Sequence, residues 1–252
     1  MYYEAQADEK YHLHFFYIVD AINTPPHFHD STEAFFMIDG SCEACVNGVN
    51  KTIKKGDLVF VDGYDVHSFV SENMRGYSVV IAKTYLNLLK ELNGTFDNFL
   101  HLSGENFDGL LDYLNANYTV TRFKNPFYAQ SFACGFMARL VELFEIKPKI
   151  EDKRKSLTVK IMKYVNKNFN RQISVGTVAK EFGYSENYLS AVFKKFAKLS
   201  FCDYLNYVRY SAVEEEIIRG ESTLTEAVME CGFGSLNTYY RAKNRFKNTS
   251  KR

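Results

Sequence analysis

Three histidines and a glutamate in the first third of the chain have the chemistry of a ligand or metal site. His27 and His29 are separated by one residue, Glu33 follows four residues later, and His67 comes after a Gly-Asp turn. Side chains two residues apart on a strand point to the same face, so a strand would present His27 and His29 together. Imidazole nitrogens are ligands that divalent transition metals bind well.

A second group of candidate residues lies in a unit that occurs twice in the last third of the chain, at 173–196 and 224–246. Each copy predicts a short helix, a Gly-aromatic turn at Gly183 or Gly232, and a second helix. The glycines supply the left-handed residue at which the chain reverses. A Ser or Thr is expected to cap each of the four helices, at Ser174, Ser185, Thr225 and Ser235. The pattern predicts two helix-turn-helix units.

The segment between the two copies predicts a helix over 201–218, which would hold the units in a fixed relative position. Its apolar residues recur at helical spacing and are expected to face inward. They are Tyr204, Leu205, Val208, Ala212, Ile217 and Ile218.

The net charge of +1 conceals a division between the two halves of the chain. Residues 1–152 hold 12 Lys and Arg against 21 Asp and Glu, whereas residues 153–252 hold 19 against 9. A basic segment gains affinity for a polyanion by releasing counterions, although a solvated basic surface is the alternative. No apolar run approaches the roughly 20 residues that cross a bilayer, so no membrane partner is expected.

Residues 157–252 resemble the DNA-binding domain of the AraC family of transcription regulators. The two repeats, the YLNYVR stretch and the GFGSLNTYYRA segment carry this resemblance. It implies a reader of double-stranded DNA that uses the second helix of each unit in successive major grooves, with RNA polymerase as a partner if it activates. The implied contact residues are Asn187, Ser190, Ala191, Lys194 and Lys195 in the first unit and Leu236, Asn237, Tyr240 and Arg241 in the second.

Arg241 is expected to be the strongest base contact, because a guanidinium can bind guanine O6 and N7 with two hydrogen bonds. The alternatives are a phosphate contact or an ion pair with Glu226 or Glu230. The chain departs from the family at Ala191, where an arginine is usual, and at Lys243, where a core residue is expected. Either Lys243 extends its ammonium to water or the helix is shifted in register.

Between residues 11 and 82, short alternating apolar runs broken by turn residues predict a small antiparallel barrel or sandwich. Asn47-Gly48 predicts a tight hairpin. The segments HFHDSTEAFFMIDG and GDLVFVDGYDVH resemble the two motifs of cupin barrels, with Asp62-Gly63-Tyr64 and Ser71 as departures. The resemblance brings His27, His29, Glu33 and His67 to one site.

Three interpretations of this cupin-like site remain open. Cupin domains of AraC-type regulators hold a small effector or keep the residues as a structural remnant, and this is the preferred interpretation. No cofactor is expected, yet His27, His29, Glu33 and His67 would suit a divalent metal if one binds. A metal-dependent cupin enzyme with an accessory helical domain is the main alternative function, and a sensor whose helical domain binds protein is another.

The predicted fold is therefore α+β with two domains. We expect a cupin-like effector-sensing barrel at 1–82 with trailing helices at 83–147, a linker at 148–156, and an all-α DNA-binding domain at 157–252. An apolar face at Phe132, Phe136, Leu140, Val141, Leu143 and Phe144 predicts a homodimer through the trailing helices, or packing on the barrel itself. Five scattered cysteines and no leader-like segment favour the reducing cytoplasm.

Overall fold

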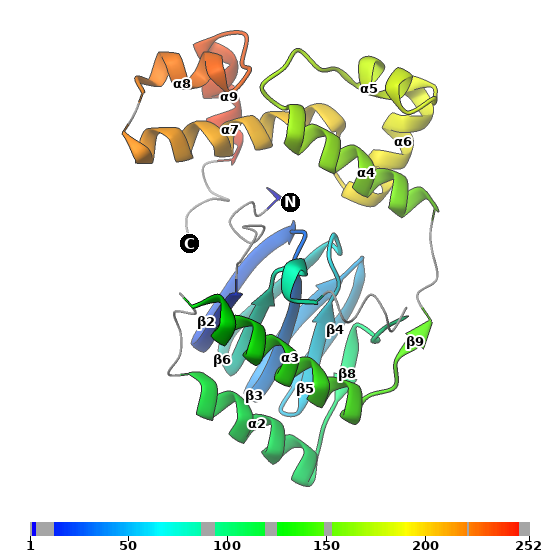
Figure 1. Cartoon of the computed structure of the whole chain (residues 1–252), viewed down its shortest axis with the longest axis vertical. Helices are drawn as coiled ribbons and strands as arrows, with labels where there is room; N and C mark the ends of the chain where they lie inside the picture. Colours follow the sequence, from blue (N-terminus) through cyan, green and yellow to red (C-terminus); the bar gives the residue numbers. More distant parts are fainter. Residues whose placement is uncertain are drawn as a thin grey trace. The chain divides into compact units, whose positions relative to one another are not determined.

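The computed structural model describes residues 2–3, 13–86, 94–118, 125–148, 153–220 and 222–246. The chain divides into two compact units, one formed by Glu4–Ile150 and the other by Glu151–Arg252 together with Met1–Tyr3. The first unit is built mainly on an antiparallel sheet and the second on helices, which confirms the α+β fold class (Figure 1).

The first unit is a bent antiparallel sheet followed by two helices. The strands of the sheet are β2 (Leu13–Phe28), β3 (Thr32–Val46), β4 (Val49–Lys54), β5 (Asp57–Val61), β6 (His67–Ile81) and β8 (Phe99–His101). β2, β6, β3, β5 and β8 lie side by side in that order, and β4 pairs with β3. The other elements are η2 (Lys83–Leu86), β7 (Gly94–Thr95), α2 (Gly104–Tyr118), α3 (Pro126–Leu143) and β9 (Lys147–Pro148).

Two glycine turns shape this sheet. Asn47 and Gly48 have φ of 52° and 86° and join β3 to β4, so the predicted hairpin is confirmed. At Gly40 the register of β3 against β6 shifts, and φ is +81°. A Cβ there would lie 2.4 Å from the carbonyl oxygen of Asn73, so only glycine allows the close approach at this bend.

The two faces of the sheet bury different residues because side chains alternate along each strand. Phe36 belongs to the core that α2 and α3 cover, whereas Phe35 stacks on Phe69 in a second core on the opposite face. Phe132, Phe136 and Leu140 of α3 are buried in the first core. The apolar face for which a homodimer contact or packing on the barrel was predicted therefore packs on its own domain.

Part of the region expected to be helical forms strands instead. β8 lies within 83–147, and its residues Phe99–His101 pair with the edge strand β5. The amide of Leu102 then donates to the carbonyl of Gly56 at 2.8 Å. A segment of three residues is too short to show the period of two that identifies a strand, so its pairing depends on the edge that β5 offers.

The second unit is helical, with β1 (Tyr2–Tyr3) grouped with it. Its helices are α4 (Lys153–Asn168), α5 (Val175–Glu181), α6 (Glu186–Ala197), α7 (Phe201–Arg219), α8 (Leu224–Glu230) and α9 (Leu236–Phe246). α7 buries Tyr204, Leu205 and Val208 as predicted. Ile217 and Ile218, in contrast, are 40% and 84% exposed. Their predicted burial is wrong because the buried part of α7 ends at Val213 and its last turn lies in solvent.

Candidate nucleic-acid interface and a buried histidine cluster

α5 and α6 form the first helix-turn-helix unit with the predicted caps. The Ser174 side chain accepts from the amide of Thr177, and Thr177 reaches back to the Ser174 amide in a capping box. Gly183 adopts φ of +73° in the turn. Ser185 then accepts from the amide of Tyr188 and starts α6. Both caps satisfy amides that the first turn of a helix leaves without partners.

α8 and α9 form the second unit, with one cap at a different residue. Thr223, rather than the predicted Thr225, accepts from the amide of Glu226 and forms a capping box with its side chain. The prediction of Thr225 is wrong because α8 begins earlier, at Leu224. Ser235 accepts from the amide of Thr238 at the start of α9, as expected. Gly232 has φ of +84° in the turn.

The reading helix of the first unit, α6, has one buried and one exposed face. Leu189, Val192, Phe193 and Ala197 are buried. The residues expected to contact DNA lie on the other side, with Ser190 half-buried and the rest exposed: Asn187, Ala191, Lys194 and Lys195. The stacked rings of Tyr184 and Tyr188, 5.2 Å apart, are also exposed and were not predicted. Their spacing of four residues at the start of the helix was the available signal.

α9 presents its expected contact residues in the same way. Asn237, Tyr240 and Arg241 are exposed and Leu236 is half-buried, while the buried face consists of Tyr239, Ala242 and Phe246. Arg241 forms no ion pair with the other described residues, so neither predicted acidic neighbour engages it. The guanidinium remains exposed on the face where a base contact was expected.

Lys243 occupies the core position of α9 without a shift of register. It lies eight residues after Ser235, as Phe193 does after Ser185. Its ammonium donates to Glu214 of α7 at 3.0 Å and to the Tyr239 hydroxyl at 3.1 Å. These two hydrogen bonds raise the pKa of Lys243 above its usual range. The long side chain thus reaches out of the core without a register shift, but its ammonium binds Glu214 and Tyr239 where the first alternative expected water.

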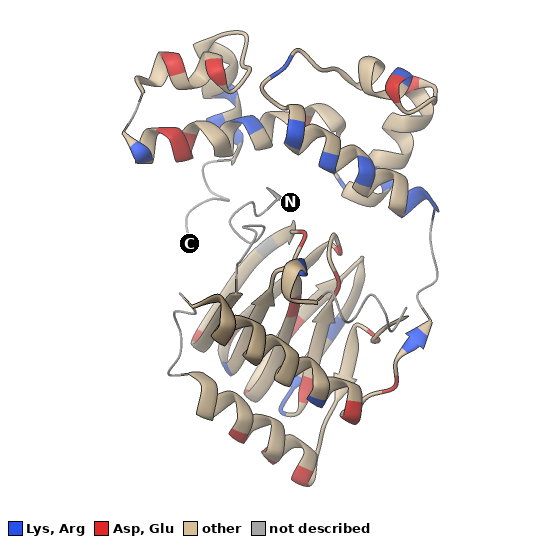
Figure 2. Cartoon of the chain, in the orientation of Figure 1, with Lys and Arg blue, Asp and Glu red and all other residues tan. Residues whose placement is uncertain are grey.

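Basic residues also gather on a helix that was not assigned a role in DNA binding. α4 contains Lys153, Arg154, Lys155, Lys160, Lys163 and Lys167 and no acidic residue. Figure 2 shows these residues along α4, whereas acidic residues gather on α8 and the end of α7. The KRK and KIMK segments were the sequence signal. α4 is therefore a further candidate for phosphate contacts.

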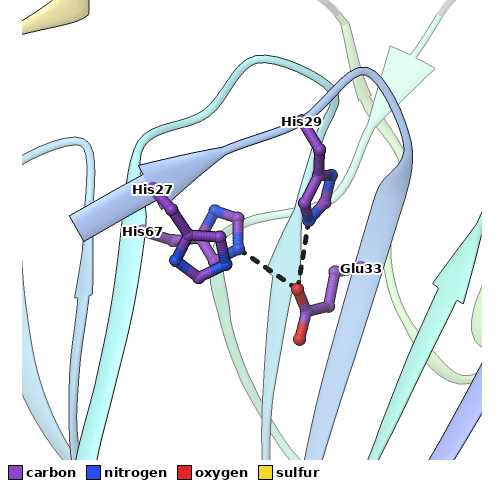
Figure 3. A group of neighbouring side chains, drawn as sticks. All are labelled: His27, His29, Glu33 and His67. Carbon is purple, nitrogen blue, oxygen red and sulfur yellow. Dashed lines mark hydrogen bonds and ion pairs between the residues drawn. The ribbon is translucent and has the colours of Figure 1, made fainter. Parts of the chain in front are cut away.

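In the N-terminal unit, Glu4–Ile150, four side chains converge at one buried point (Figure 3). They are His27, His29, Glu33 and His67. They come from β2, the turn after it, β3 and the start of β6, and their candidate ligand atoms all lie within 4.8 Å of one another. Glu33 Oε2 is 3.2 Å from His29 Nε2 and 3.1 Å from His67 Nε2. The Ser78 hydroxyl donates to Glu33 Oε1 at 2.7 Å. The structure thus brings together all four predicted residues.

The outer nitrogens of two imidazoles determine what this cluster can bind. His29 Nδ1 lies 2.9 Å from the carbonyl oxygen of Ser31, and His67 Nδ1 lies 2.9 Å from that of Asp65. A carbonyl oxygen only accepts, so each Nδ1 carries a hydrogen. In the neutral ring Nε2 then points a lone pair at the carboxylate. An Nε2 lone pair and a carboxylate oxygen attract each other only with a proton or a cation between them, and the same Nδ1 anchoring orients histidines that bind metals.

Glu33 supplies a buried negative charge. Burial raises the pKa of Glu33, but the hydrogen bonds of His29 and His67 outweigh it and hold the pKa well below its usual range. An ionised carboxylate with two anchored imidazoles and a third nearby fits the nitrogen and oxygen ligands of a divalent transition metal.

Two protein-family models match separate parts of the chain. A model described as a helix-turn-helix domain, of the AraC type, matches residues 178–250, and one described as a cupin domain matches residues 10–80. The chain combines an AraC-type helix-turn-helix domain at its C-terminal end with an N-terminal cupin domain. Helix-turn-helix domains of the AraC type characterise a DNA-binding, non-enzymatic family of transcription regulators. This match supports the prediction that the protein is no enzyme, and the alternative of a cupin enzyme loses support.

Solved structures with this architecture share the fold of the regulator at low sequence identity. ToxT from Vibrio cholerae O395 is 13% identical, with a TM-score of 0.56 over 92% of this chain and 91% of ToxT. ToxT from strain SCE256 with an unsaturated fatty acid bound is 17% identical, with a TM-score of 0.53 over 94% and 91%. No curated protein matches the chain. In the described part of the chain no helix is both long and apolar enough to cross a membrane.

Proposed function

We propose that the regulator recognises its operator by placing α6 and α9 in successive major grooves, and that a small ligand in the cupin domain changes this binding. One observation carries the DNA-reading part of the proposal. In both helices the residues expected to contact DNA lie on the exposed side, and the opposite side is buried in its own unit. An α-helix with such a free polar face fits the major groove.

The side chains divide into those that read bases and those that bind phosphates. Arg241 suits guanine, and Asn187 and Asn237 suit adenine, because each can form two hydrogen bonds with the base edge. Lys194 and Lys195 lie in the last turn of α6 and are suited to the backbone. Sequence specificity should therefore depend on the base-reading residues, and the salt dependence of the affinity should depend on the two lysines.

Selection of bound sequences from a random duplex pool, followed by titration against salt, tests this division. We expect the selected duplex to be bound with a salt slope that reflects several phosphates. Replacing Lys194 and Lys195 with glutamine should reduce that slope by about two and leave the selected sequence unchanged. Failure of the wild type to bind any duplex would contradict the proposed function.

The buried cluster of His27, His29, Glu33 and His67 is the proposed ligand site of the cupin domain. Its polar atoms converge in the buried interior of the domain, where the His67 ring lies 5.9 Å from that of Phe69. A ToxT structure contains an unsaturated fatty acid, which supports a small-molecule effector for a regulator of this architecture. An effector that binds here must offer polar or cationic groups to these four residues.

A divalent transition metal is the second candidate for this site, because the Nδ1 atoms of His29 and His67 are already bound to carbonyl oxygens. Elemental analysis of purified protein and titration with zinc alone test it. We expect about one metal ion per chain in the wild type, a loss in His27→Ala, and no change in the control His101→Ala, whose ring is exposed. Metal well below one per chain, with unchanged DNA binding in His27→Ala, would exclude the metal.

A further inference from the structure

The two helix-turn-helix units pack against overlapping stretches of α7. The Tyr204 ring lies 5.6 Å from that of Phe193 in the first unit, and the Tyr207 ring lies 5.4 Å from that of Phe246 in the second. Figure 1 shows α6 near one end of α7 and α8 near the other. A single helix that joins two packed units leaves them some freedom to roll or bend relative to each other.

Arg209, near the middle of α7, forms a second connection to the first unit. Its Nε donates to the carbonyl oxygen of Phe169, and its Nη2 donates to that of Arg171, both at 2.8 Å. Arg209 is only 9% exposed, although arginine is rarely buried without partners. Phe169 and Arg171 lie just after α4, so the guanidinium binds the loop that leads from α4 to α5.

The same loop touches the turn of the second unit. A Cβ on Gly232 would lie 2.7 Å from the Phe169 carbonyl oxygen and 3.0 Å from the backbone of Asn170. Gly183, which holds the corresponding place in the first unit, has nothing within 4 Å of its Cβ position. Both glycines have positive φ, but only at Gly232 would a side chain also block the approach of another backbone segment.

We infer that loop 169–171, Arg209 and Gly232 form a junction that fixes the spacing of the two reading helices. The loop leads from α4 into α5 of the first helix-turn-helix unit, Gly232 belongs to the second, and Arg209 belongs to the helix that joins them. The junction therefore closes a ring of contacts around α7. A closed ring removes the rolling that a single connection permits. Arg209 is thus a positioning residue that acts through the loop and contacts no DNA in this arrangement.

This inference rests on the proposed reading of successive grooves by α6 and α9, because spacing matters only when both helices bind one duplex. Inserting one base pair between the two half-sites rotates the second groove by about 35° and moves it by roughly 3.4 Å. A regulator with rigidly spaced helices binds the inserted duplex poorly. One with loosely connected units tolerates the insertion and binds the original duplex less tightly, because it loses orientational freedom on binding.

The experiment compares the selected duplex with the same duplex carrying one inserted base pair. For the wild type we expect the insertion to weaken binding by about 10-fold or more. Gly232→Ala and Arg209→Met should bind the original duplex about 10-fold less tightly and discriminate against the insertion by less than about 3-fold. The matched controls are Gly183→Ala, at a glycine that also has positive φ but open space around its Cβ position, and Arg219→Met, at an exposed arginine of α7. Both should keep wild-type discrimination.

Hydrogen exchange of the free protein supplies a readout that needs no DNA. Amides 170–173 should exchange faster in Gly232→Ala than in Gly183→Ala if Gly232 holds the loop. Should Arg209→Met not fold, Gly232→Ala decides alone, because it removes no hydrogen-bonding group. The inference is wrong if Gly232→Ala loosens the loop and still discriminates against the insertion, or if it leaves loop exchange unchanged. A wild type that binds no duplex would instead contradict the proposed function.

Discussion

Arg241 and Ala191 hold corresponding places, each six residues after the serine that caps its reading helix. Both are exposed, but a methyl group offers only an apolar contact whereas a guanidinium binds guanine with two hydrogen bonds. We therefore expect Arg241→Ala to lower discrimination at one base pair by about 10- to 100-fold. Competition binding against all single-base variants of the selected site measures this loss.

Asn187→Ala is the matched comparison, because it removes a base-reading side chain from the first unit. It should relax specificity less than Arg241→Ala, since the first reading helix lacks the arginine. A greater loss of discrimination in Asn187→Ala would show that the first unit dominates recognition.

The contact of Lys243 with Glu214 and Tyr239 replaces apolar packing at one position of the second unit. Burial and the hydrogen bond to Glu214 raise the pKa of Tyr239 to about 12, so its hydroxyl stays protonated and donates to Glu214 at 2.6 Å. Lys243→Met keeps an apolar stem and leaves that bond intact. We expect its melting temperature to stay within about 2 °C of the wild type or to rise, because half-exposed ion pairs contribute little.

Glu214→Ala should have the opposite effect at the same place. It leaves both the Tyr239 hydroxyl and the Lys243 ammonium without their acceptor, which costs about 1 kcal/mol, or roughly 4 °C. Calorimetry of the two variants separates these cases. Equal destabilisation by both would mean that the Lys243 charge itself holds α9 in place.

At the scale of helices, the capping box of α8 is expected to set the stability of the second unit's first helix. Thr223→Ala removes the hydroxyl that accepts from Glu226, at a cost of about 1 kcal/mol. Amides of α8 should then exchange about five times faster with solvent. Thr225→Ala, an exposed threonine inside the same helix, is the control and should change little. A larger effect at Thr225 would mean that α8 begins later than the structure indicates.

The elements predicted correctly are those whose signals lie within a few residues. Asn47-Gly48 requires positive φ, and the Ser174 and Ser185 caps precede helices directly, so short-range rules were sufficient. Even the error at Thr225 was local, because Thr223 and Glu226 have the spacing of a capping box. The strand β8 and the exposure of Ile218 depend on which distant segments pack nearby. No local pattern contains that information.

The same division between local and distant signals holds for the histidine cluster and for the junction at Arg209. His27, His29, Glu33 and His67 could be grouped through a motif resemblance, and the structure brings their ligand atoms together. The anchoring of His29 and His67 by backbone carbonyls could not be predicted, because it depends on how the turns at Ser31 and Asp65 close. The junction at Arg209 was hidden for a similar reason, since its partners Phe169 and Arg171 lie 40 and 38 residues away in the sequence.

At the scale of the whole molecule, the predicted homodimer must use residues other than the buried face of α3. Phe127 and Tyr128, at the start of α3, are 83% and 63% exposed, and large apolar side chains that are exposed together mark interaction surfaces. We expect Phe127→Arg to shift a wild-type dimer toward monomer in sedimentation velocity. The same variant should lose more affinity for DNA that carries two operators than for DNA that carries one, because a dimer on linked sites gains from a raised effective concentration.

Phe16→Arg is the matched control for this prediction, because Phe16 is a half-exposed aromatic residue on β2. It adds the same charge to the same domain and should leave the sedimentation coefficient unchanged if the dimer forms through α3. An equal shift in both variants would indicate a nonspecific effect of charge. A wild type that sediments as a monomer at micromolar concentration would refute the dimer, and cooperation between operators would then have to arise on the DNA.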